Sequence, residues 1–142
     1  MEGPMKPVTI EQANQIGMLQ TLGIRLTDVG DDYAVMEVIV DERHSNYFGG
    51  VHGGLLATLV DTVAFFPKPL LPSGRMVTTA NLTANYLKGP QLGDRLIARS
   101  QIEHLGRRTV SLTVRVTGSG DKLLVHGSVT LIVLKQPDEP TP

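Results

Sequence analysis

Apolar and polar residues alternate along several segments of this chain, which is the pattern of β-strands with one face on a core. The segments with this pattern are residues 24–29, 33–40, 76–87, 95–104, 109–116 and 122–134. Short turns rich in glycine and aspartate join several of them, including "GDD" between the first two and "GSGD" before the last. Because strands joined by short turns run in opposite directions, we predict an antiparallel sheet.

The alternation also assigns residues to faces. Within residues 76–87, Met76, Leu82 and Ala84 fall on one face, whereas Val77 and Thr79 fall on the other, more polar face. In residues 109–116, the side chains expected to share one apolar face are Val110, Leu112, Val114 and Val116.

Two segments have helical patterns. Residues 8–22 begin with Thr9 as a candidate N-cap and Gln12 three positions later, and they end before Gly23, which predicts one short helix. Residues 53–66 are apolar on most sides and are followed by "PKPLLPSG", which ends a helix. A helix that is apolar nearly all round is buried, so we expect it to pack on the sheet in an α+β fold.

Length and composition fit a single globular domain over residues 1–142, with a core at about residues 20–134 and a flexible tail at 135–142. The net charge of −1 provides no general attraction to nucleic acid or acidic membranes, so we expect neither as a partner. The absence of cysteine excludes disulfides and a cysteine nucleophile. No apolar run has the length of a membrane span and no signal core is visible, so we expect a cytoplasmic location.

The predicted buried helix carries an acid, Asp61, in a narrow strip of small and polar residues. Gly54 and Thr58 fall on the same strip, with Ala57 at its edge. Small residues allow a ligand or another backbone to come close, which makes Gly54 a candidate for substrate contact. A buried carboxylate is costly unless it is paired, hydrogen-bonded or functional. Asp61 therefore either bonds a nearby hydroxyl or water, or serves as a catalytic carboxylate in a cleft.

The helix is preceded by "GGVHGG", residues 49–54. The first amides of a helix have no intrahelical partner, glycine lets a ligand atom approach them, and the helix dipole favours negative charge there. The segment is therefore either an oxyanion site or a tight loop that needs positive φ angles. It does not match the phosphate-binding pattern G-x-x-x-x-G-K-[ST].

Gly53 and Asp61 lie eight residues apart, which is about 12 Å along a helix axis. They cannot both contact one reacting carbonyl in the same chain. If both are functional, two such helices must lie antiparallel across a two-fold axis, which predicts a dimer with two shared sites.

The pattern of Asn46, Gly49, "GVHGG" and a carboxylate nine residues after the histidine resembles that of the hotdog-fold acyl-CoA thioesterases, specifically the phenylacetate-degradation type. The later "VTTANLTANYLKGPQLGD" and "GRR" also resemble this family, and the similarity covers roughly residues 20–134. The resemblance implies an antiparallel sheet wrapped around a long central helix. It also implies an acyl-CoA substrate, no cofactor, and active sites at the interface of a homodimer, which in this family often pairs into a tetramer.

The resemblance further implies roles for single residues. Asn46 and Gly53 would hold the thioester carbonyl, with Gly53 contributing its backbone N–H. His52 would support that loop and contact the carbonyl. Asp61 from the partner chain would be the nucleophile or the base that activates water, and Thr79 would orient that water or Asp61.

Thioester hydrolysis needs only a carboxylate and oxyanion donors, so no metal is expected. The histidines do not have a metal-ligand spacing, and those other than His52 are expected to be structural or solvated: His44, His104 and His126. Lys88, Arg107 and Arg108 lie in predicted turns and are either ligands of the CoA phosphates or solvated surface charges. Two alternatives remain, a non-catalytic acyl-CoA-binding protein and a hotdog-fold hydratase.

Overall fold

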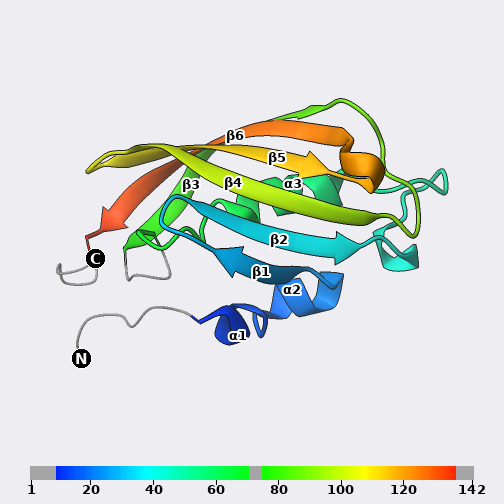
Figure 1. Cartoon of the computed structure of the whole chain (residues 1–142), viewed down its shortest axis with the longest axis horizontal. Helices are drawn as coiled ribbons and strands as arrows, with labels where there is room; N and C mark the ends of the chain where they lie inside the picture. Colours follow the sequence, from blue (N-terminus) through cyan, green and yellow to red (C-terminus); the bar gives the residue numbers. More distant parts are fainter. Residues whose placement is uncertain (1–8, 71–74, 137–142) are drawn as a thin grey trace.

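The computed structural model describes residues 9–70 and 75–136. Its elements in chain order (Figure 1) are α1 (Ile10–Ala13), α2 (Gly17–Leu22), β1 (Arg25–Val29), β2 (Tyr33–Ile39), the 3-10 turn η1 (Glu42–His44), α3 (Gly53–Val63), β3 (Met76–Tyr86), β4 (Arg95–Leu105), β5 (Thr109–Thr117), the 3-10 turn η3 (Ser119–Asp121) and β6 (Leu123–Lys135). Within the described residues, no helix is both long and apolar enough to cross a bilayer.

The strands form one six-stranded sheet in the order β1-β2-β4-β5-β6-β3, and every neighbouring pair is antiparallel. The predicted antiparallel sheet is therefore confirmed. β3 and β4 follow each other along the chain but do not pair, because β3 pairs with β6 at one edge while β4 pairs with β2. Residues 87–94 are thus a crossover. Glycine and proline in this segment indicate where the chain turns, but not which strand it pairs with afterwards.

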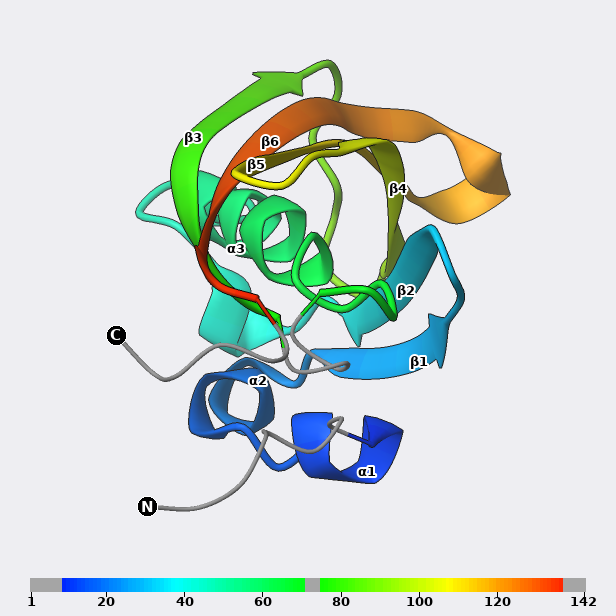
Figure 2. The same cartoon turned by 90° about the vertical axis from the view of Figure 1, so that its left-hand side faces the viewer.

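The sheet curls around α3 (Figure 2). The helix buries Leu55, Leu56, Leu59, Val60 and Val63. From β5, the predicted set of Val110, Leu112, Val114 and Val116 is buried, which confirms that face. An antiparallel sheet wrapped around a central α-helix is the α+β architecture expected from the sequence.

Gly127 of β6 allows a close approach between sheet and helix. A Cβ added there would lie 2.9 Å from Cγ1 of Val60 and 3.1 Å from the Thr83 carbonyl oxygen. A side chain at this position would push α3 away from the sheet.

The N-terminal helix is divided in two, contrary to the prediction of one helix over residues 8–22. Thr9 does form the predicted capping box with Gln12, and Gly23 ends α2 with a φ of 70°. Between the helices, Asn14 donates to the Leu26 carbonyl at 3.0 Å and accepts from the Leu26 N–H at 2.7 Å. The chain leaves the helical path where this side chain pairs with the backbone of β1.

The face assignment within β3 is also wrong. The strand's pairing with β6 shifts register between Thr79 and Asn81, at a β-bulge. Val77 is buried before the shift, whereas Leu82 and Ala84 pack against the core after it. One extra residue reverses the alternation that a regular strand would keep, so Val77 and Leu82 share the inner face.

Two expectations fall partly on residues that the structure does not describe. The predicted helix over residues 53–66 ends at Val63, and the last four residues of "PKPLLPSG", 71–74, lie outside the described residues. Of the predicted tail, Lys135 is the last residue of β6, and residues 137–142 lie outside the described residues.

Candidate active site

Among the residues that the structure describes, the start of α3 has one backbone amide without a hydrogen-bond acceptor. His52 is the N-cap, and its Nδ1 accepts a hydrogen bond from the Gly54 N–H at 2.8 Å. The Leu55 N–H donates to the His52 carbonyl at 3.1 Å. No acceptor among the described residues bonds the Gly53 N–H. Gly53 therefore carries the amide that a ligand oxygen can reach, at the helix end that favours negative charge.

Tyr86, the last residue of β3, fastens this helix start to the sheet. Its hydroxyl donates to the Gly53 carbonyl at 2.8 Å, and a Cβ added to Gly53 would lie 3.1 Å from Cε2 of the ring. Sequence reasoning missed Tyr86, because the alternation of a strand does not indicate which helix its last side chain contacts.

Asn46 organises the loop that leads to α3. Its Oδ1 accepts from the Phe48 and Gly50 amides at 2.9 Å each, and its Nδ2 donates to the Val51 carbonyl at 3.4 Å. Gly49 has a φ of 83°, so the tight-loop interpretation holds at that position. Contact between Asn46 and a thioester carbonyl stays a prediction.

The remaining histidines have the surroundings expected for structural or solvated groups. His44 is buried, its Nδ1 accepts from the Asp41 N–H at 3.0 Å, and its Nε2 lies 2.6 Å from the Leu22 carbonyl oxygen. The Nδ1 contact requires the proton of a neutral ring to be on Nε2. His104 and His126 are exposed. Over residues 9–70 and 75–136, no three His, Asp or Glu side chains group as metal ligands would.

Asp61 is partly buried in the last turns of α3, and Thr79 of β3 donates to its Oδ1 at 2.6 Å. The short distance is that of a hydroxyl donating to a charged oxygen. This contact agrees with the orienting role that the family resemblance implied for Thr79. It also agrees with the simpler interpretation that Asp61 only bonds a nearby hydroxyl, so both interpretations stay open on this observation.

No residue of the described ranges fully covers the strip that carries Asp61. Gly54 is exposed, and Ala57, Thr58 and Asp61 are partly exposed, in contrast to the buried leucines and valines of the same helix. The expectation that α3 is buried nearly all round is therefore wrong along this strip. Sequence periodicity identified the strip, but the absence of a covering element is a property of the fold.

A pocket of about 300 Å³ adjoins the start of α3. His52, Gly54 and Thr58 line it together with Leu22 and Arg43. Gly54 thus lies at the edge of a cavity, as a substrate-contacting residue must.

Gly53 and Asp61 lie at opposite ends of α3, eight residues and about 12 Å apart. The sheet register agrees: Tyr86, which bonds Gly53, pairs with Val125, whereas Thr79, which bonds Asp61, pairs with Leu131. One chain therefore does not bring its predicted carbonyl donor and its predicted acid together.

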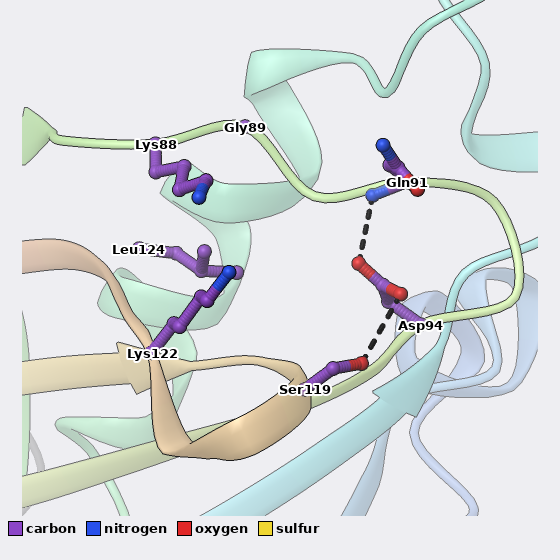
Figure 3. Close-up of a pocket in the computed structure, with 7 residues that line it drawn as sticks. All are labelled: Lys88, Gly89, Gln91, Asp94, Ser119, Lys122 and Leu124. Atoms are coloured by element: carbon purple, nitrogen blue, oxygen red, sulfur yellow. Dashed lines mark hydrogen bonds between the residues drawn. The ribbon is translucent and has the colours of Figure 1, made fainter.

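The predicted phosphate ligands are separated in the same way. Lys88 lies in a pocket of about 190 Å³ that also contains Leu124 (Figure 3), whereas Arg107 and Arg108 line a pocket of about 140 Å³ beside Val133. Leu124 and Val133 are about 30 Å apart along β6. Lys88 is at the Gly53 end of the fold, and the two arginines are at the Asp61 end.

Comparison with known proteins shows what the chain is similar to. A family model described as the thioesterase superfamily matches residues 48–125, more than half of the chain. Mouse acyl-coenzyme A thioesterase 13 is 27% identical over 111 residues, covering 75% of this chain and 77% of its own length.

Solved structures of other proteins share the fold, among them the following three. A thioesterase of Haemophilus influenzae has a TM-score of 0.81 at 27% identity, covering 94% of this chain and 96% of its own. A hypothetical thioesterase protein of Streptococcus pneumoniae, solved with coenzyme A, has a TM-score of 0.72 at 28% identity, with 80% and 87% covered. Escherichia coli PaaI, from the phenylacetic acid degradation operon, has a TM-score of 0.73 at 23% identity, with 80% and 86% covered.

Proposed function

The chain belongs to the thioesterase superfamily and is a thioester hydrolase, and on this premise we propose that it hydrolyses acyl-CoA thioesters at sites shared between two copies of the chain. The predicted resemblance to the hotdog-fold thioesterases is confirmed by the family match and by the shared fold. Acyl-CoA is the substrate class we propose, because the mouse relative is an acyl-coenzyme A thioesterase and the S. pneumoniae neighbour was solved with coenzyme A.

The observation that carries the proposal is the uncovered strip of α3. At one end it has the Gly53 N–H, which no described residue accepts from, and at the other end it has Asp61, held by Thr79. Between them the strip consists of small residues such as Ala57 and Thr58, which permit another helix to pack closely. An acid and an amide donor are the two groups that thioester hydrolysis requires, and here they are one helix length apart.

A second copy of the chain would supply the missing half of each site. With two α3 helices antiparallel across a two-fold axis, Gly53 of one chain faces Asp61 of the other. β3 is an edge strand, and its outer edge has no partner strand among the described residues. It can extend the sheet into the partner. The same arrangement would place Lys88 of one chain near Arg107 of the other. Pairing of such dimers into a tetramer stays an expectation from the family.

In this site, Asp61 acts as a base or as a nucleophile. As a base it takes a proton from water, and the oxygen of that water adds to the carbonyl carbon. The resulting oxyanion accepts a hydrogen bond from the Gly53 N–H of the other chain, at the positive end of its helix dipole. Collapse of the adduct breaks the C–S bond, the thiolate takes up the proton, and the free acid leaves. In its neutral form the His52 ring carries its proton on Nε2, since Nδ1 accepts from Gly54, and so has a donor to offer the same carbonyl.

Asp61→Asn tests the assignment. We expect thiol release from a panel of acyl-CoAs of different chain lengths and aryl-acetyl groups to fall by about 10²–10⁴-fold, while binding of the thioester is retained. Asp31→Asn is the matched control, because Asp31 is an exposed acid in the β1–β2 turn. Full activity in Asp61→Asn would remove the catalytic role of the acid.

The alternatives give different results in the same assay. A non-catalytic binder would retain acyl-CoA without releasing thiol from any member of the panel. A hydratase would consume the double bond of an enoyl-CoA without releasing thiol.

A further inference from the structure

Two lysine side chains meet in the pocket at the Gly53 end of the fold. Lys88 follows β3 and Lys122 precedes β6, and both ammonium groups line the same pocket of about 190 Å³ (Figure 3). The pKa of Lys88 is lowered from its ordinary value by Lys122, first through the close approach of the two side chains and then through the charge of the Lys122 ammonium group. Within the described part of the chain, neither lysine forms an ion pair with a carboxylate. Two neighbouring positive charges that no described carboxylate contacts directly favour the binding of an anion between them.

The opposite side of this pocket carries an acceptor. The Asp94 carboxylate lies across the hollow from the two ammonium groups (Figure 3). It accepts from the Gln91 N–H at 2.8 Å and from the Ser119 hydroxyl at 3.3 Å. Each oxygen keeps a further lone pair, which suits a hydroxyl group of a ligand and repels a second anion. The pocket is therefore matched to a phosphate that is carried next to a sugar hydroxyl rather than to a bare polyanion.

The size of the pocket indicates that it holds one end of a longer molecule. Pockets that enclose a whole drug-sized ligand measure roughly 300–1,000 Å³, whereas this one measures about 190 Å³. A phosphorylated sugar can occupy it while the rest of the ligand extends outside.

The position of the pocket links it to the proposed active site. The Leu87 and Lys88 amides both donate to the Leu124 carbonyl, at 2.8 and 3.3 Å, which anchors the pocket to the start of β6. Directly before them, Tyr86 donates to the Gly53 carbonyl at 2.8 Å. Three consecutive residues from Tyr86 to Lys88, each fixed by a hydrogen bond, therefore link the lysine pair to the helix start that would hold the thioester carbonyl.

We propose that Lys88 and Lys122 bind the 3′-phosphate of the CoA ribose, with Asp94 accepting a hydrogen bond from the neighbouring 2′-hydroxyl. The inference rests on the proposed function, and it adds Lys122 and Asp94 to the substrate site. Arg107 and Arg108 would then contact other parts of CoA or remain solvated surface charges.

The first test is an equilibrium measurement that needs no turnover. Adenosine 3′,5′-bisphosphate is titrated into the wild type, Lys122→Met and Lys122→Arg in a calorimeter, with adenosine 5′-monophosphate as the ligand that lacks the 3′-phosphate. We expect Kd for the bisphosphate to rise about tenfold in Lys122→Met, the loss of roughly 1.4 kcal/mol, and to stay near the wild-type value in Lys122→Arg. Arg115→Met is the matched control, because it removes an exposed cation from β5.

The second test compares an acyl-CoA with its acyl-dephospho-CoA, which keeps the diphosphate but lacks the 3′-phosphate. We expect the kcat/KM for acyl-CoA divided by that for acyl-dephospho-CoA to fall about tenfold in Lys122→Met. In the double variant with Lys88→Met, this ratio should approach one. A drop of equal size for both substrates would assign the lysines to the diphosphate and overturn the proposal, as would bisphosphate binding that is unchanged in Lys122→Met.

The two tests separate this inference from the function on which it rests. Lysine-dependent bisphosphate binding without any thioester hydrolysis would retain the phosphate site and reject the hydrolase. Suppose instead that hydrolysis depends on Asp61, but that wild type and Lys122→Met show the same preference for acyl-CoA over acyl-dephospho-CoA. The hydrolase function would then stand and the phosphate site would be rejected.

Discussion

Replacing Gly53 by proline would delete the unpaired amide at the start of α3 while leaving the helix intact. Gly53 is the first helical residue, a position where proline is well tolerated because its ring has the φ of a helix. The preceding His52 has φ −66° and ψ 128°, which is the extended conformation that a residue before proline prefers. The Gly53 N–H has no partner among the described residues, so the substitution breaks no hydrogen bond of the described chain.

The expected loss can be stated from the chemistry of the site. Removing one donor to an oxyanion lowers kcat by about 10²–10³-fold, or roughly 2.7–4 kcal/mol. A Cβ at this position lies 3.1 Å from Cε2 of Tyr86, and Gly53→Ala introduces the same contact while keeping the N–H. Gly53→Ala therefore controls for the Cβ contact, and the two variants differ in the amide N–H and in the ring atoms Cγ and Cδ of proline. We expect their free energies of unfolding to agree within about 1 kcal/mol.

The assay is thiol release at saturating acyl-CoA, with urea unfolding to confirm that both variants fold. If folded Gly53→Pro has a kcat within a few-fold of Gly53→Ala, the amide does not stabilise the oxyanion and the predicted role of Gly53 is wrong.

Mixing the subunits tests the shared site. When inactive Gly53→Pro and inactive Asp61→Asn chains are unfolded and refolded together, each mixed dimer has one intact site, so about a quarter of the wild-type activity should return. A mixture that stays inactive would place both groups in sites of single chains.

Thr79→Val should lower kcat about 10- to 100-fold with little change in KM, because it removes the 2.6 Å hydrogen bond to the Asp61 carboxylate and such bonds to charged groups contribute about 1.5–3 kcal/mol. Thr79→Ser keeps the hydroxyl and should keep most of the activity, so equal kcat values for the two variants would contradict an orienting role. Gly127→Ala should lower the free energy of unfolding by about 1–3 kcal/mol, because its Cβ would lie 2.9 Å from Cγ1 of Val60. Adding Val60→Ala removes that atom, and urea titration should show a double variant less destabilised than the sum of the single changes, whereas additive losses would mean that the two positions do not touch.

The residues that sequence reasoning placed correctly are those with a local physical cause. Thr9 caps a helix because its side chain reaches an amide three residues later, and Gly23 ends one because it adopts a positive φ. Asp61 was identifiable because a charge in an apolar helix requires a partner, and the structure provides one in Thr79. Each of these depends on neighbours in the chain or on the energy of burying one group.

The misplaced features depend on contacts between distant segments. Asn14 interrupts a helical pattern because it pairs with the backbone of β1. The bulge after Thr79 arises in the pairing of β3 with β6, and no change in the alternating sequence marks it. Lys122 lies 34 residues after Lys88, and only the folding of the chain brings their ammonium groups into one pocket.

The sequence by itself determined where the strands and the central helix begin, that Thr9 and Gly23 are capping residues, which helix carries the acid, and that Gly53 and Asp61 stay apart on it, because periodicity and capping act over a few neighbouring residues. The tertiary structure decided that β3 lies beside β6 and that no described residue covers the strip of α3 that carries Asp61. These properties follow from which surfaces pack together, and packing partners are chosen by the shape and burial of the whole fold rather than by the local alternation of residues.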